Sequence, residues 1–105
     1  MTKNEAKESL VSALREQGID YIVEGDVVEF EDLSVRFETN YINLRYDSVS
    51  VHYHLSTLSY ITVMGGAFWI STTNNHEFTV VYFSQTRTPV YSTRNVRQMS
   101  AGFDD

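Results

Sequence analysis

The segment from Leu58 to Phe83 reads as strands in which both faces are mainly apolar, and this pattern restricts the fold more than any other feature. Because alternate residues of a strand point to opposite faces, each face corresponds to one parity of positions. One parity holds Tyr60, Met64, Trp69, Val80 and Tyr82, and the other holds Ile61, Val63, Phe68, Ile70, Val81 and Phe83. Gly65-Gly66 and Asn74-Asn75-His76 divide the segment into strands that hairpins connect. A strand with two apolar faces needs cover on both of them.

Three sources could cover the second apolar face. The sheet could curl until its wings cover one another, as in a small barrel or sandwich, or a second copy or a different protein could pack on it. Closure is favoured, because it is the ordinary way in which β proteins protect edges and inner faces. The source of the cover bears directly on function.

Residues 21 to 55 have a different pattern, in which each expected strand has one apolar face and one solvent-exposed polar face. Apolar and polar residues alternate over 33–37, 42–46 and 49–55. Gly25-Asp26 lies between two short runs of the same kind, and glycine at the first central position is what a type II′ hairpin turn requires. A further turn is expected at Thr39-Asn40.

A helix is expected over residues 3–17. Thr2 and Glu5 have the spacing of a capping box, and Gly18 is suited to end the helix in a left-handed conformation. The apolar stripe consists of Ala6, Leu10, Ala13 and Leu14. The predicted fold class is therefore α+β, with an N-terminal amphipathic helix packed on a bent, mainly antiparallel sheet of about six to eight short strands.

The length of 105 residues fits one domain. We expect a single α+β domain over residues 1–84 and an extended C-terminal arm over residues 85–105. The arm contains the only proline and three arginines, Arg87, Arg94 and Arg97.

Composition excludes several functional classes. The chain has no cysteine, so thiolate metal sites, iron–sulfur clusters and cysteine nucleophiles are excluded. No nucleophile-elbow or phosphate-binding glycine motif occurs, and we expect a protein that is not an enzyme and holds no cofactor. No run approaches the roughly 20 apolar residues of a membrane span, and the first residues lack the apolar core of a signal peptide. We therefore expect a cytoplasmic protein without membrane contact.

The net charge of −6 comes from the N-terminal third of the chain. Residues 1–32 hold nine acidic residues against three basic ones, and the remaining residues hold five of each. The expected partner-binding residues are the acidic Glu24, Asp26, Glu29, Glu31 and Asp32, with Tyr46 and Trp69 as aromatic anchors. Acid–base catalysis by these carboxylates is disfavoured, because a hairpin tip is wet and catalytic carboxylates need a cleft of low dielectric.

The leading hypothesis is a non-enzymatic protein-binding module that occupies a partner's surface. Small size, acidity and the absence of cysteine are a profile shared with many accessory proteins of phages and mobile elements, including inhibitors of host enzymes that mimic the charge of DNA. This likeness is one of composition alone.

Three alternatives depend on other residues. His52, His54 and His76 could hold a metal ion with an open position, as in a hydrolase or a sensor. Arg36 and Arg45, beside Tyr41 and Tyr46, could bind single-stranded nucleic acid, although the negative net charge makes such a partner unfavourable. The surplus apolar face could make the protein a homo-oligomeric structural component.

Overall fold

The computed structural model describes residues 1–73, 77–82, 90–92 and 97–98, the last two segments by their backbone alone. Helix α1 (Lys3–Glu16) is followed by strands β1 (Ile22–Glu24), β2 (Val27–Phe30), β3 (Leu33–Phe37), β4 (Tyr41–Tyr46) and β5 (Val49–His54). The short helix η1 (Leu55–Thr57) leads to β6 (Leu58–Met64), β7 (Ala67–Thr72), β8 (Phe78–Tyr82), β9 (Val90–Ser92) and β10 (Arg97–Gln98).

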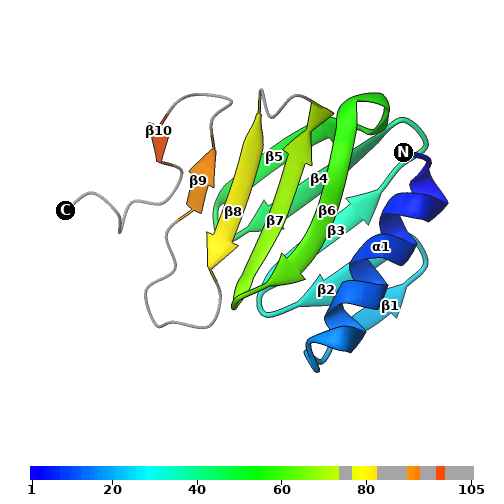
Figure 1. The fold of residues 1–105 in the computed structure, drawn as a ribbon, viewed down its shortest axis with the longest axis vertical. Helices are drawn as coiled ribbons and strands as arrows, with labels where there is room; N and C mark the ends of the chain where they lie inside the picture. The colour runs from blue at the N-terminus through cyan, green and yellow to red at the C-terminus, as the bar shows by residue number, and fades with distance from the viewer. Residues whose placement is uncertain (74–76, 83–89, 93–96, 99–105) are drawn as a thin grey trace.

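The strands form two antiparallel sheets that face each other (Figure 1). The N-terminal sheet has the order β1-β2-β3-β4-β5, and the C-terminal sheet has the order β10-β9-β8-β7-β6. One hydrophobic core contains residues of α1 and of both sheets. The predicted α+β class is confirmed, with the refinement that the strands divide at η1 into two layers instead of forming one bent sheet.

This division covers one of the two apolar faces of residues 58–82. Ile61, Val63, Phe68, Ile70 and Val81 are buried in the shared core. Phe30 of the N-terminal sheet meets Phe68 with ring centroids 5.9 Å apart. The second apolar set, which includes Tyr60, Met64 and Trp69, lies on the outward side of the C-terminal sheet. Phe83 and the expected turn at residues 74–76 lie outside the described residues.

Helix α1 is stabilised at both ends by local hydrogen bonds. At the start, the Thr2 hydroxyl accepts from the Glu5 backbone N–H at 3.1 Å, and the Glu5 carboxylate accepts from the Thr2 N–H at 2.9 Å. At the end, Gly18 has a φ of 70° and the Ile19 N–H donates to the Leu14 carbonyl at 3.0 Å. Both ends agree with the predicted cap and terminator.

The helix lies beside β6 and in front of the first strands of the N-terminal sheet (Figure 1). Its apolar stripe is buried, and the Ser9 hydroxyl donates to the Ile61 carbonyl at 3.3 Å. Because β6 is an edge strand, this contact covers backbone groups that would otherwise be open to pairing. In the described part of the chain, no helix combines the length and hydropathy needed to cross a membrane.

Residues 85–105 are described only in part. Val90–Ser92 pairs with β8, and Arg97–Gln98 pairs with β9. The remainder of this segment lies outside the described residues, and the domain boundary at residue 84 stays a prediction.

One buried polar contact connects the two sheets. The hydroxyl groups of Tyr53 on β5 and Thr79 on β8 are 2.7 Å apart, and both residues are almost fully buried. A buried hydroxyl without a partner costs more than the net gain of the hydrogen bond itself. The pair therefore favours one relative position of the two layers.

We expect Tyr53→Phe and Thr79→Val each to lower the free energy of unfolding by about 1–2 kcal/mol, because each breaks the hydrogen bond between two buried hydroxyl groups. The double variant should lose less than the sum of the single losses, by at least about 0.5 kcal/mol. Urea unfolding measures all three. Losses that add to within about 0.3 kcal/mol would show that the two hydroxyl groups do not depend on each other.

Candidate functional site

The turn between β2 and β3 holds two carboxylates in an unfavourable backbone conformation. Phe30 pairs with Leu33, so Glu31 and Asp32 form a two-residue loop, and their φ angles are 48° and 67°. Two positive φ angles are typical of a type I′ turn, which asparagine and glycine form most readily. A glutamate in this conformation is strained.

This turn borders an open pocket of about 470 Å³. Its lining contains four carboxylates, Asp20, Glu29, Glu31 and Asp32, together with Tyr21, Ile22, Phe30, Leu33 and Ser34. The four carboxylate residues are exposed, whereas Phe30 and Leu33 are buried. We call this site the acidic pocket.

Among the described residues, the carboxylates of the acidic pocket form no ion pair, although Arg15 of α1 donates to the hydroxyl of Tyr21, which lines the pocket, at 3.3 Å. Within residues 1–73 and 77–82, the ion pairs are Lys3 and Lys7 with Asp26 and Arg36 with Glu38. None of them involves a carboxylate of the pocket. The pocket therefore presents four exposed carboxylates around an apolar base.

Strand β1 adds an exposed apolar edge beside the pocket. It is an outer strand of the N-terminal sheet, and the exposed fractions of Ile22 and Val23 are 60% and 42%. Glu24 is also exposed and lies on the same face as Glu29, because Ile22 pairs with Glu29 and Glu24 with Val27. A partner at the pocket could thus bury apolar side chains as well as meet negative charge.

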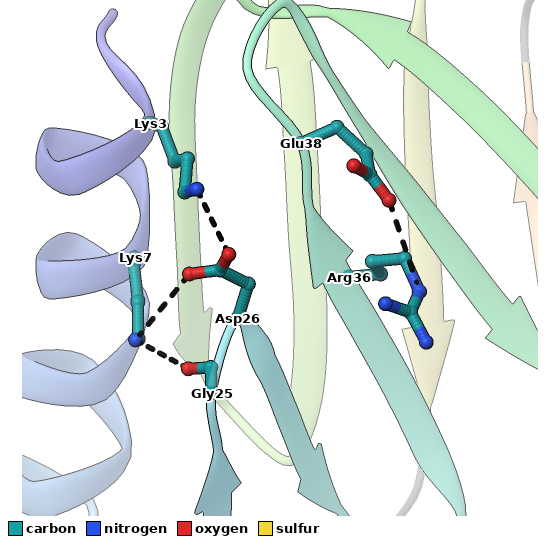
Figure 2. Close-up of polar contacts among 6 residues, drawn as sticks. All are labelled: Lys3, Lys7, Gly25, Asp26, Arg36 and Glu38. Atoms are coloured by element: carbon teal, nitrogen blue, oxygen red, sulfur yellow. Dashed lines mark hydrogen bonds and ion pairs between the residues drawn. The ribbon is translucent and has the colours of Figure 1, made fainter.

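Asp26 has a different role from the other predicted acidic residues. Lys3 Nζ lies 2.8 Å from one carboxylate oxygen of Asp26, and Lys7 Nζ lies 4.0 Å from the other (Figure 2). Lys7 also donates to the Gly25 carbonyl at 2.6 Å. The hydrogen bond from Lys3, aided by the charges of Lys3, Lys7 and Arg36, lowers the pKa of Asp26 below its ordinary value. These contacts connect the β1–β2 turn to the helix.

The predicted turn at Gly25-Asp26 is confirmed in position. Glu24 pairs with Val27, and Gly25 has a φ of 59° while Asp26 has no positive φ, which is the type II′ pattern. The geometry brings Asp26 toward the first turns of α1 (Figure 2).

The two predicted aromatic anchors lie in different places. Tyr46 pairs with Leu33 across β3 and β4, so it lies next to the acidic pocket, half-buried against the core. Trp69 lies on β7 in the other sheet, where its indole N–H donates to the Met64 carbonyl at 3.2 Å. The structure therefore groups Tyr46 with the acidic residues and separates Trp69 from them.

The outward face of the N-terminal sheet holds His52 and His54 of the metal hypothesis and Arg36, Arg45 and Tyr41 of the nucleic-acid hypothesis, whereas Tyr46 lies on the inward face. His52 pairs with Asn43, His54 pairs with Tyr41, and the rings of Tyr41 and His52 have centroids 5.3 Å apart. Arg36 and Arg45 are on the same face, and Arg36 lies 3.9 Å from the Glu38 carboxylate. His76 lies outside the described residues, and among those described no three metal-ligating side chains come together.

Sequence reasoning missed Asp20 and the Glu31–Asp32 turn. The sequence did contain a signal for the turn. Buried residues follow one another at a spacing of two along each strand, but the spacing from Phe30 to Leu33 is three. That step is what a two-residue hairpin loop produces. Asp20 carried no comparable signal, since only the end of α1 and the start of β1 bring it to the pocket.

No family model, no curated protein and no solved structure matches this chain.

We expect Asp26→Asn to lower Tm slightly at pH 7. The lowered pKa of Asp26 means that its charged form stabilises the fold at pH values above its pKa in the unfolded chain. This contribution is lost as the pH falls through the lowered folded-state pKa, so the Tm values of the two proteins should converge in acid. Thermal unfolding between pH 2 and 7 checks this, and a difference that persists at pH 2 or grows in 1 M NaCl would contradict it.

We expect Glu31→Asn/Asp32→Gly to raise the free energy of unfolding by about 1 kcal/mol, because both new residues accept a positive φ. Gly65, the first residue of the β6–β7 turn, has a φ of 61° and open space around it, so Gly65→Glu is a matched control. This control should lose about 1 kcal/mol. Chemical denaturation measures both, and a neutral or destabilising Asn-Gly turn would show that the present turn is unstrained.

Proposed function

We propose that this chain is a cytoplasmic, non-enzymatic protein-binding module that engages a basic surface of another protein through the acidic pocket. The observation that carries the proposal is the Glu31–Asp32 turn, where two carboxylates outside the ion pairs of the described residues occupy strained positions beside an open pocket. Strained backbone is most often retained where it serves a function. Here the strain accompanies negative charge at the mouth of a concave surface.

Charge and apolar area support the proposal together. Four exposed carboxylates attract a basic surface and raise its association rate. Ile22, which lines the pocket and is 60% exposed, offers apolar area that a partner could bury at the same place. Asp26 contributes less than the sequence alone implied, because two lysines of α1 already compensate its charge.

The exposure of the carboxylates is better suited to binding than to catalysis. A catalytic carboxylate needs a low-dielectric cleft that separates its pKa from those of its neighbours. In the acidic pocket all four carboxylate residues are exposed. A partner that handles nucleic acid has a basic surface of the required kind, and inhibition of such an enzyme by a phage or mobile-element accessory protein is the finer form of the proposal.

A second candidate function is single-stranded nucleic-acid binding on the outward face of the N-terminal sheet. The strand register places Arg36, Arg45, Tyr41 and His52 on that face, which combines cationic and aromatic side chains. Glu24 and Glu29 share the face through β1 and β2 and oppose a phosphate backbone. The first proposal is therefore preferred.

We expect Glu29→Lys/Glu31→Lys to weaken association with the partner at least about tenfold while leaving Tm nearly unchanged, because both residues are exposed and outside the ion pairs of the described residues. The tagged 105-residue chain is used to recover the partner from a nuclease-treated lysate of its source. The dissociation constant is then measured with the purified pair at several salt concentrations.

Glu8→Lys/Glu16→Lys is the matched control, with the same change of charge at exposed positions of α1 outside the pocket. It should leave most of the affinity intact. Equal loss in both variants would mean that only the net charge matters. Recovery of nucleic acid from an untreated lysate, with loss on Arg36→Ala, would favour the second candidate function instead.

A further inference from the structure

Strand β1 is an outer strand of the N-terminal sheet, and the hairpin register identifies its free edge. Glu24 and Val27 flank the two-residue turn and form a hydrogen-bonded pair, so the next pair, Val23 and Val28, is not hydrogen-bonded. The N–H and the carbonyl of Val23 therefore point away from β2. Within the described residues, no other strand pairs with this side of β1.

The neighbouring pair of strands agrees with this alternation. The Phe37 N–H donates to the Asp26 carbonyl at 2.8 Å, so these two residues form a hydrogen-bonded pair between β2 and β3. Two residues further along β2, Val28 directs its backbone groups to β3 as well. Val28 therefore has no backbone group that could bond to Val23.

The free edge of β1 coincides with exposed apolar side chains. All three residues of β1 are exposed, Ile22 to 60% and Val23 to 42%. On β5, the other outer strand of this sheet, the exposed residues are the polar Ser50, His52 and His54. Of these two strands, β1 is thus the one that offers a partner both backbone groups and apolar area.

Helix α1 holds β1 in place from both ends. Before the strand, Arg15 donates to the Tyr21 hydroxyl at 3.3 Å. After it, Lys7 donates to the Gly25 carbonyl at 2.6 Å (Figure 2). A strand that is already ordered loses little conformational freedom when a partner pairs with it.

The two faces of β1 differ in charge. Ile22 and Glu24 lie on the outward face with Glu29, and Ile22 also lines the acidic pocket. Val23 pairs with the buried Val28 and so lies on the opposite face, the side of α1. Because side chains alternate along a strand, a segment added at this edge meets carboxylates with one set of side chains and Val23 with the other.

We propose that the basic partner binds as an extended segment that adds to β1 as a further strand of the N-terminal sheet. This inference rests on the proposed function and specifies its binding mode. The segment carries an apolar residue opposite Val23, between two basic residues that lie beside Ile22 and Glu24. The basic residue beside Ile22 lays its aliphatic part on that side chain, while its charge points toward Glu29 and the pocket.

The length of β1 determines where specificity comes from. The strand has three residues, and a short edge strand offers few main-chain hydrogen bonds. In strand addition these bonds contribute affinity, and the alternate side chains select the sequence. The carboxylates beside β1 therefore distinguish a basic segment from an acidic segment of the same length.

A synthetic peptide tests the inference without knowledge of the natural partner. A seven-residue peptide of alternating lysine and valine, blocked at both ends, is titrated to about 2 mM into the isotope-labelled 105-residue chain. Amide chemical shifts measure the dissociation constant. Val23→Pro removes the outward-pointing N–H but no bond to β2, and Val23→Thr is the matched control that keeps this N–H. We expect Val23→Pro to raise the dissociation constant at least about tenfold and Val23→Thr to change it less than about threefold.

Hydrogen exchange in the unmodified chain separates loss of the N–H from a local change caused by proline. The exchange of the Val23 amide should slow at least about twofold when the peptide is bound. The His54 amide is the matched control, because the same alternation points it away from β4 at the opposite edge of the sheet. Its exchange rate should stay unchanged.

Several results would overturn the added strand. They are no binding of the peptide, equal affinity for the peptide with glutamate in place of lysine, unchanged affinity of Val23→Pro, and a Val23 amide that gains no protection. The proposed function fails separately, if Glu29→Lys/Glu31→Lys keeps its affinity for the natural partner. Loss of that partner in the glutamate variant but not in Val23→Pro would retain the acidic pocket as the binding site and remove only the added strand.

Discussion

The packing of the two sheets against one helix is the interaction on which the other features depend. The N-terminal sheet needs cover on its inward face, and β6 to β8 supply it over one part while α1 supplies it beside β6, where it meets β3; the residues of β1 stay exposed. Helix and sheet thus form one layer, joined where Ser9 meets the β6 backbone. The helix protects an edge strand and completes the core at once.

The position of α1 also determines which acidic residues remain available. Its first two turns bring Lys3 and Lys7 to Asp26, so the negative charge at the β1–β2 turn is used within the molecule. At the opposite end of β2, Arg15 of the helix donates to the Tyr21 hydroxyl, but no ion pair among the described residues involves Glu29, Glu31 or Asp32, and these three residues are exposed. The acidic segment 24–32 therefore stabilises the fold through Asp26 at one end and exposes carboxylates to a partner at the other.

Local sequence alone determined α1, the strands from β1 to β8 and the turns at Gly25 and at Gly65-Gly66, because caps, the apolar period and left-handed glycines act over a few residues. It also indicated that residues 58–82 have two apolar faces. Only the tertiary structure decided which parity faces the core, since that depends on contacts between Phe30 and Phe68 or Tyr53 and Thr79, far apart in the chain. In the same way, only the packing of α1 removed Asp26 from the acidic surface and brought Asp20 into it, because charge compensation depends on distance in space and not on spacing along the sequence.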